Sequence, residues 1–203
     1  MKKISFIFGL LFALILQVQA QTADEIFGRY YDATGGTELW KGVNSYIIKQ
    51  AFVANAPTDF TQETKVSVAG QGILKTKTIL KRAFIYGANP TEAYFRVPTG
   101  SLDKNVVYET KDLSDKDKAG LKREMTDGLL PFIDYAKKGY IATYVGLKAD
   151  NGKPVHQIEL SGKDVKYNLF FDATTYLLSK LKTNLASGEE ITQEFTTYTK
   201  TPY

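Results

Sequence analysis

The alternation of hydrophobic and polar positions changes its period near Asn44. Before that point apolar residues recur at helical spacing and end at Gly35-Gly36, which predicts a helix from Thr22 to Thr34. After it the period is two, and runs rich in β-branched and aromatic residues are separated by turn formers. These runs predict strands at Ser45–Val53, Glu63–Val68, Ile73–Ile85, Glu92–Val97 and Asn105–Thr110.

A helical insertion from Ser114 to Gly139 interrupts the strands. Ser114 is a suitable N-cap for a helix that runs to Met125, and Gly128 and Pro131 break it before a short apolar second helix. Strands are then predicted at Tyr140–Leu147, Val155–Leu160, Val165–Phe171, Leu177–Thr183 and Ile191–Tyr198. The fold class is therefore expected to be α+β: one domain with a single curved antiparallel sheet, an N-terminal helix and an insertion that covers the concave face.

One face of the late strands is apolar and the other is polar. An open, curved sheet must cover such a face with helices or with a ligand. The candidate ligand-lining residues are Ile141, Val145, Ile158, Leu160, Tyr167, Leu169 and Phe171. The insertion supplies a candidate lid of Leu129, Phe132 and Ile133. A second interpretation, in which all of these side chains are simply core, stays open.

The first twenty residues have the pattern of a secretory signal peptide. Lys2 and Lys3 precede an apolar run from Phe6 to Leu16, and Val18-Gln19-Ala20 supplies small residues for cleavage. The mature domain is then expected to span residues 21–203, without a cysteine for lipid anchoring, in the periplasm or outside the cell. Loss of the two lysines takes the 26 basic residues to 24 against 22 acidic residues, a net charge of +2. So small a charge, evenly spread, argues against nucleic-acid binding.

The amino-acid composition excludes most classes of catalytic and metal-binding site. The chain has no cysteine, which excludes disulfides, zinc–thiolate sites, iron–sulfur clusters and cysteine nucleophiles. Its one histidine, His156, lies in no recognisable nucleophile motif and is expected to be a strand histidine. We therefore expect no enzyme, no catalytic residue, no metal and no cofactor. Four basic residues give the insertion helix a charged face that is either solvated or meets anionic headgroups: Lys116, Lys118, Lys122 and Arg123.

Three stretches resemble secreted Bacteroidetes proteins of the outer-membrane lipoprotein-sorting type. They are the opening helix from Ala23 to Gly36, the segment Pro131–Gly146, and the hairpin Tyr167–Leu178 with its Tyr-x-x-x-Phe-Asp pattern. The hairpin departs from the family at Tyr176, where glycine is usual, which predicts a different turn geometry. These proteins are related to the LolA, LolB and LppX carriers.

The resemblance implies an unclosed β-barrel that binds lipid or the acyl chains of lipoproteins during periplasmic transport. It also implies a membrane surface or a protein as a further partner. The alternative is a non-enzymatic structural or interaction module of the same fold, with a filled core and no lipid. A cavity of several hundred cubic ångströms lined by the candidate residues named above would favour the carrier.

Overall fold

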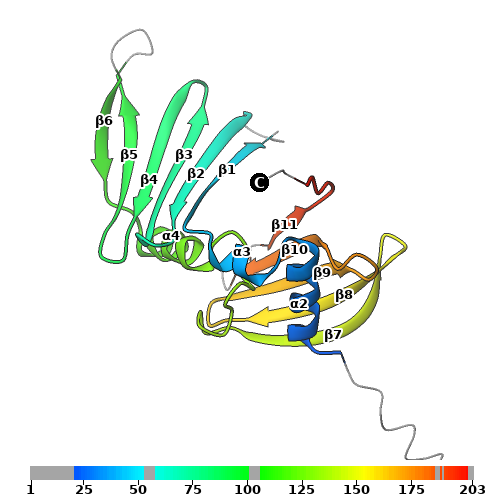
Figure 1. Ribbon diagram of the computed structural model, residues 1–203. Coiled ribbons are helices and arrows are strands. Elements are labelled where there is room, and N and C mark those ends of the chain that lie inside the picture. The colour runs from blue at the N-terminus through cyan, green and yellow to red at the C-terminus, as the bar shows by residue number, and fades with distance from the viewer. Residues whose placement is uncertain (1–20, 53–57, 101–105, 186–187, 189, 201–203) are drawn as a thin grey trace, which may run out of the picture. The chain divides into compact units, whose positions relative to one another are not determined.

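The chain folds into two compact units. The computed structural model describes residues 21–52, 58–100, 106–185, 188 and 190–200, so the proposed signal peptide lies outside the described residues. One unit comprises Gly35–Ile141 and holds a six-stranded sheet. The other combines Met1–Thr34 with Ala142–Tyr203 and is built on a five-stranded sheet. Figure 1 labels the elements of both units.

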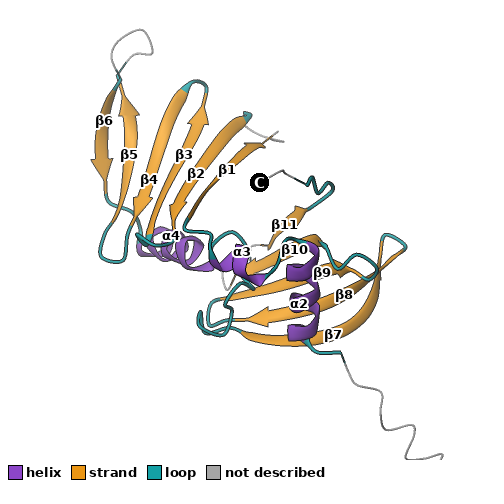
Figure 2. Cartoon of the chain, viewed as in Figure 1, coloured by secondary structure: helices purple, strands orange, loops and turns teal. Residues whose placement is uncertain are grey.

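The six-stranded unit is an antiparallel meander in which each strand pairs with the next along the chain (Figure 2). Its elements are α3 (Thr37–Lys41), β1 (Ser45–Phe52), β2 (Phe60–Ser67), β3 (Gly72–Ile79), β4 (Arg82–Ala88), β5 (Ala93–Thr99), β6 (Val107–Lys111) and α4 (Asp115–Asp127). The β2–β3, β3–β4 and β4–β5 connections are short turns, because antiparallel neighbours need only a few connecting residues.

Helix α4 supplies the core of this unit by packing on β3, β4 and β5. Its Ser114 N-cap accepts a hydrogen bond from the Asp117 amide at 3.1 Å, as the sequence predicts. Leu121 and Met125 lie four residues apart, on one face of the helix. They join the buried sheet residues Val66, Ile73 and Ala88, with Leu113, Tyr46, Tyr86, Ala93 and Phe95 around them.

The segment after α4 is not the second helix that the sequence predicts. Successive i→i+3 turns connect residues 130–139, and positive φ angles of 72° at Gly128 and 52° at Asp134 interrupt helical geometry. Lys138 holds the segment against α4, because its ammonium donates to the Asp127 carbonyl at 2.6 Å. The Tyr140 hydroxyl donates to the Asp127 carboxylate at 2.5 Å.

The five-stranded unit places α2 on its sheet. Its elements are α2 (Ala23–Ala33), β7 (Ile141–Asp150), β8 (Lys153–Ser161), β9 (Val165–Asp172), β10 (Leu178–Leu185) and β11 (Glu190–Glu194). The rings of Phe27 and Tyr30 meet the Phe171 ring edge-on, with centroids 5.9 and 5.8 Å apart. The N-terminal helix therefore covers the apolar face of the late strands.

The α+β class with unclosed antiparallel sheets is confirmed, but the described strands form two sheets where the sequence analysis expected one. The chain leaves β6 at Lys111 and reaches β7 only at Ile141, and no pairing joins these two strands in the described part of the chain. The position of the insertion is also corrected. Helix α4 packs on the early strands, and α2 packs on the late strands.

Two adjacent phenylalanines of β9 test the α2 packing. Phe171 is fully buried, whereas Phe170 points to the opposite face, where the Lys180 ammonium lies 5.7 Å from its ring. We expect Phe171→Ala to lower the free energy of unfolding by about 3–5 kcal/mol. The matched control Phe170→Ala should cost only about 1 kcal/mol. Urea unfolding, with hydrogen exchange of the β8 and β9 amides as a second readout, measures the free energy of unfolding of both variants. Equal losses of free energy in the two variants would contradict the packing of α2 on Phe171.

Candidate functional site

A row of five residues crosses the six-stranded sheet on the face opposite α4. The strand register aligns Ile47 with Lys65, Lys65 with Leu74, Leu74 with Gly87, and Gly87 with Tyr94. Directly paired residues share a face, and the adjacent row, which includes Val66, Ile73 and Ala88, packs with α4. The first row therefore points away from the helix.

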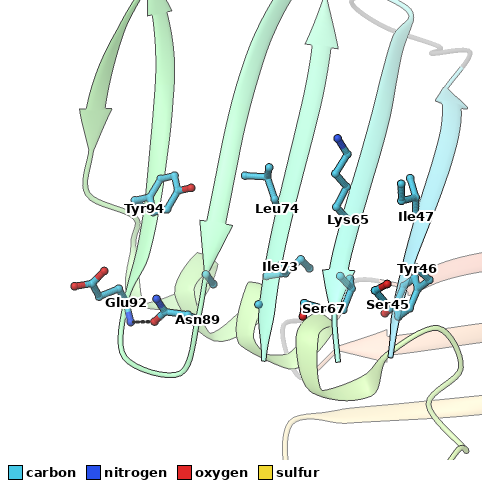
Figure 3. Close-up of a pocket in the computed structure, with 13 residues that line it drawn as sticks. Ser45, Tyr46, Ile47, Lys65, Ser67, Ile73, Leu74, Asn89, Glu92 and Tyr94 are labelled. Carbon is cyan, nitrogen blue, oxygen red and sulfur yellow. Dashed lines mark hydrogen bonds between the residues drawn. The ribbon is translucent and has the colours of Figure 1, made fainter. Parts of the chain in front are cut away.

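This row forms a wall of an open groove with a volume of about 570 Å³. Figure 3 shows Ile47, Lys65, Leu74 and Tyr94 side by side along it. The groove is lined by residues 45–47, 65–67, 72–74, 88, 89, 92 and 94, which come from β1 to β5 and from the β4–β5 turn. Because Gly72 has no side chain, and Ser45 and Ser67 have short ones, the strand ends leave the groove open.

The wall is apolar except at Lys65. Ile47 is 57% exposed, so its side chain is available to a ligand. The Lys65 ammonium forms an ion pair with Glu63 at 3.0 Å, and Lys49 lies 3.8 Å from the same carboxylate. The hydrogen bond from Lys65 holds the pKa of the Glu63 carboxyl below its ordinary value. The one charge in the wall is therefore paired with a neighbour.

Gly87 is the position that lets Tyr94 close the groove at β5. A Cβ atom on Gly87 would collide with the far end of the Tyr94 ring, which occupies the space of the missing side chain. The Arg96 guanidinium lies 5.5 Å from the centre of the same ring. The glycine and the tyrosine therefore act as a pair across β4 and β5.

The β4–β5 turn fixes the other boundary of the groove. The Asn89 side-chain oxygen accepts from the backbone amides of Thr91 at 2.9 Å and Glu92 at 2.7 Å, and from the Thr91 hydroxyl at 3.0 Å. The backbone amide of Asn89 in turn donates to the backbone carbonyl of Glu92 at 2.9 Å. Figure 3 shows Glu92 held in this way at the end of the groove, beside Asn89.

The residues that the sequence analysis chose as ligand lining lie elsewhere, in or next to the five-stranded sheet. Ile158, Leu160, Leu169 and Phe171 are completely buried and Tyr167 is 5% exposed, on the face of the sheet that α2 covers. Ile141 and Val145 are 70% and 41% exposed on β7. The structure thus brings five of the seven together and leaves two apart, and a ligand role for any of them stays a prediction.

The three candidate lid residues are also separated. Phe132 is completely buried, Ile133 is partly buried and Leu129 is 40% exposed. The groove is not visible in the sequence pattern, because Leu74, Gly87 and Tyr94 become neighbours only through strand pairing. A glycine inside the otherwise β-branched and aromatic strand β4 was the one local signal.

His156 belongs to an aromatic cluster in the five-stranded unit. The Tyr144 hydroxyl lies 3.0 Å from its Nδ1 atom, and the Tyr176 ring stacks on the imidazole at 5.4 Å. The Arg29 guanidinium lies 5.8 Å from the centre of the Tyr176 ring, on which the imidazole stacks. These partners pack and orient the imidazole, and none of them is a serine nucleophile.

Tyr176 corrects the expectation of an altered turn. Its φ of 59° is the left-handed conformation that glycine adopts readily, so the turn geometry is the one that a glycine would give. Its amide donates to the Asp172 carbonyl at 2.9 Å, and the Asp172 carboxylate accepts from the amides of Thr174 and Thr175. The stack on His156 offers a reason for a large side chain at this position.

A double-mutant cycle tests the pairing of Gly87 with Tyr94. We expect Gly87→Ala to cost about 1 kcal/mol of unfolding free energy, because the Tyr94 ring must move. In a Tyr94→Ala background the same change should be neutral, or stabilising by about 0.5–1 kcal/mol, because alanine restricts the unfolded chain. Chemical denaturation of the four proteins measures the coupling, and strictly additive effects would refute the contact.

The pH dependence of stability tests the burial of His156. Burial lowers the pKa of this imidazole below its ordinary value of 6.5, although the charges of Glu25 and Asp172 partly oppose that shift. The unfolded chain therefore binds the proton first, so the contribution of neutral His156 is complete above pH 6.5 and is lost as the pH falls through the folded pKa. His156→Gln keeps an acceptor for Tyr144 but does not titrate. Lowering the pH from 7.5 to 5 should therefore reduce the free energy of unfolding of the wild type more than that of His156→Gln. A difference between the two proteins that does not change with pH would contradict the burial.

No protein-family model and no curated protein matches the sequence. Similar solved structures include an outer membrane lipoprotein-sorting protein domain from Vibrio parahaemolyticus, with 16% identity over 83% of this chain and 80% of that chain and a TM-score of 0.46. A LolA superfamily protein from Nitrosomonas europaea has 15% identity over 90% and 80% of the two chains and a TM-score of 0.49. A DUF1329 family protein from Desulfovibrio piger has 10% identity over 78% and 73% and a TM-score of 0.43. The chain is thus similar to LolA superfamily and lipoprotein-sorting structures, and a specific relation to Bacteroidetes proteins stays a prediction.

Proposed function

We propose that this protein is a non-enzymatic carrier, periplasmic or secreted, that binds lipid or the acyl chain of a lipoprotein in the groove of the six-stranded sheet. The observation that carries the proposal is the apolar-walled groove of about 570 Å³ that crosses β1 to β5. Four strand spacings give it a length on the order of 19 Å. Burial of each methylene there would contribute at most about 0.8 kcal/mol.

The proposal moves the ligand away from the lining that the sequence predicts. The five buried side chains of that lining already contact protein, so a chain could reach them only after α2 had been displaced. Ile47 and Leu74 need no such opening. Lipoprotein sorting is the activity in the name of the Vibrio domain. The support for a related role in this chain is the groove itself.

Location belongs to the same proposal. The pattern of residues 1–20 favours export, and a cleaved signal would be seen directly as a mature N-terminus at Gln21. In the portion of the chain that the structure describes, no helix is long and apolar enough to cross a membrane.

A second candidate function is a structural or interaction module without lipid. The filled core of the five-stranded unit favours it, because Phe27, Tyr30 and the late strands bury the apolar face without a ligand. Mass spectrometry of an organic extract of the protein, purified without detergent, separates the two candidates. A stoichiometric lipid supports the carrier, and a clean extract from folded protein supports the module.

Two leucine substitutions on one hairpin test the groove. Leu74 lines it, whereas Leu80 is 70% exposed in the β3–β4 turn with a φ of 47°. We expect Leu74→Asp to weaken binding of a fluorescent fatty acid by about tenfold or more, since a leucine contact is worth roughly 1.5–3 kcal/mol. Leu80→Asp, the same chemical change in a turn that tolerates it, should leave the affinity unchanged.

The readout is a fluorescence titration of both variants and the wild type, with circular dichroism as the check that each has folded. Equal affinity of a folded Leu74→Asp protein would place the ligand elsewhere. Failure of the wild type to bind any acyl probe would remove the carrier function.

A further inference from the structure

A second pocket adjoins the groove at the β4–β5 turn. It has a volume of about 340 Å³, lies between this turn and α4, and shares Glu92 and Tyr94 with the groove. Its remaining lining residues are Thr91, Ala93, Lys118 and Lys122. An amphiphile whose chain lies in the groove would therefore bring its polar end to this pocket.

The pocket holds three charges that do not neutralise one another. The Lys122 ammonium donates to the Pro90 carbonyl at 3.0 Å, which anchors it at the turn. Among the described ion pairs, none joins Glu92 to Lys118 or Lys122, although all three side chains line the pocket. Two cations and one carboxylate thus face the same space.

We propose that this pocket binds a zwitterionic headgroup in which a phosphate is linked to an ammonium group. This inference rests on the proposed carrier function and names its ligand class. Lys118 and Lys122 bind the phosphate and Glu92 binds the ammonium, while the Thr91 hydroxyl keeps its hydrogen bond to Asn89. A purely anionic headgroup satisfies the two lysines but leaves Glu92 repelled, so complementarity favours the zwitterion.

The first test compares ligands on the wild-type protein by isothermal titration calorimetry below the micelle concentration. The ligands are monoacyl phosphatidylethanolamine, monoacyl phosphatidylglycerol and a neutral monoacylglycerol of one chain length, with free phosphoethanolamine and inorganic phosphate as chainless probes. We expect the ethanolamine lipid to bind about tenfold more tightly than the glycerol lipid, which corresponds to one well-made charge contact. We expect the chainless probes to bind far more weakly than either lipid.

Matched variants assign the selectivity to residues. Glu92→Gln should abolish the preference for ethanolamine over glycerol while the glycerol lipid binds at least as well as before. Lys118→Gln should weaken both phospholipids and leave the neutral monoacylglycerol unchanged. Lys116→Gln removes the same charge two residues earlier on α4, outside the pocket lining, and should change nothing.

The outcomes distinguish this inference from the function on which it rests. Equal binding of all three lipids, or an ethanolamine preference that survives Glu92→Gln, overturns the headgroup site and leaves the acyl carrier standing. Free phosphoethanolamine that binds as tightly as the lipid overturns the amphiphile in favour of a soluble phosphoamine. If no lipid binds, the carrier function and this inference fall together.

Discussion

The unbroken register from β1 to β5 is the constraint on which the rest of the six-stranded unit depends. Pairing of Val66 with Ile73 and of Ile73 with Ala88 directs one row toward Leu121 of α4. The next row, which includes Leu74, must then point the other way. A slip of one residue would exchange the two rows, exposing the core and filling the groove. Burial under α4 therefore determines which residues line the groove on the opposite face.

The β4–β5 turn couples this register to the polar end of the site. Asn89 accepts three hydrogen bonds within the turn, which fixes where Glu92 and Tyr94 begin the next strand. Gly87 gives the Tyr94 ring its space, and the Lys122 ammonium contacts the turn at Pro90. One short connection thus positions an aromatic wall and a carboxylate, and it also receives a cation from α4.

Local pattern located most of the elements but not their partners. A turn at Leu80 and Lys81 divides the predicted strand Ile73–Ile85 into β3 and β4, and residues 130–139 form turns where the pattern predicts a second helix. Period-two alternation indicated the antiparallel class, and the capping residue Ser114 located the start of α4, because both depend on residues near in sequence. Strand alternation does not state which sheet a strand joins, so the division at Lys111 was missed. Nor does it state which helix covers which face. The groove was missed for the same reason, since Leu74 meets Gly87 only through pairing across the β3–β4 hairpin.

The two units differ in how much of their apolar surface is covered by a helix. Substitutions in the covered face of one unit are therefore expected to affect stability, and substitutions in the open groove of the other are expected to affect the proposed binding. In the five-stranded unit, α2 closes the face over Phe171, so a change there acts on folding first. In the six-stranded unit, α4 closes one face and leaves Ile47 and Leu74 in an open groove on the other. A chain in an open groove buries only part of its surface, so its affinity lies well below that of a fully enclosed chain. Such a site suits the proposed carrier, which must release its cargo as well as bind it.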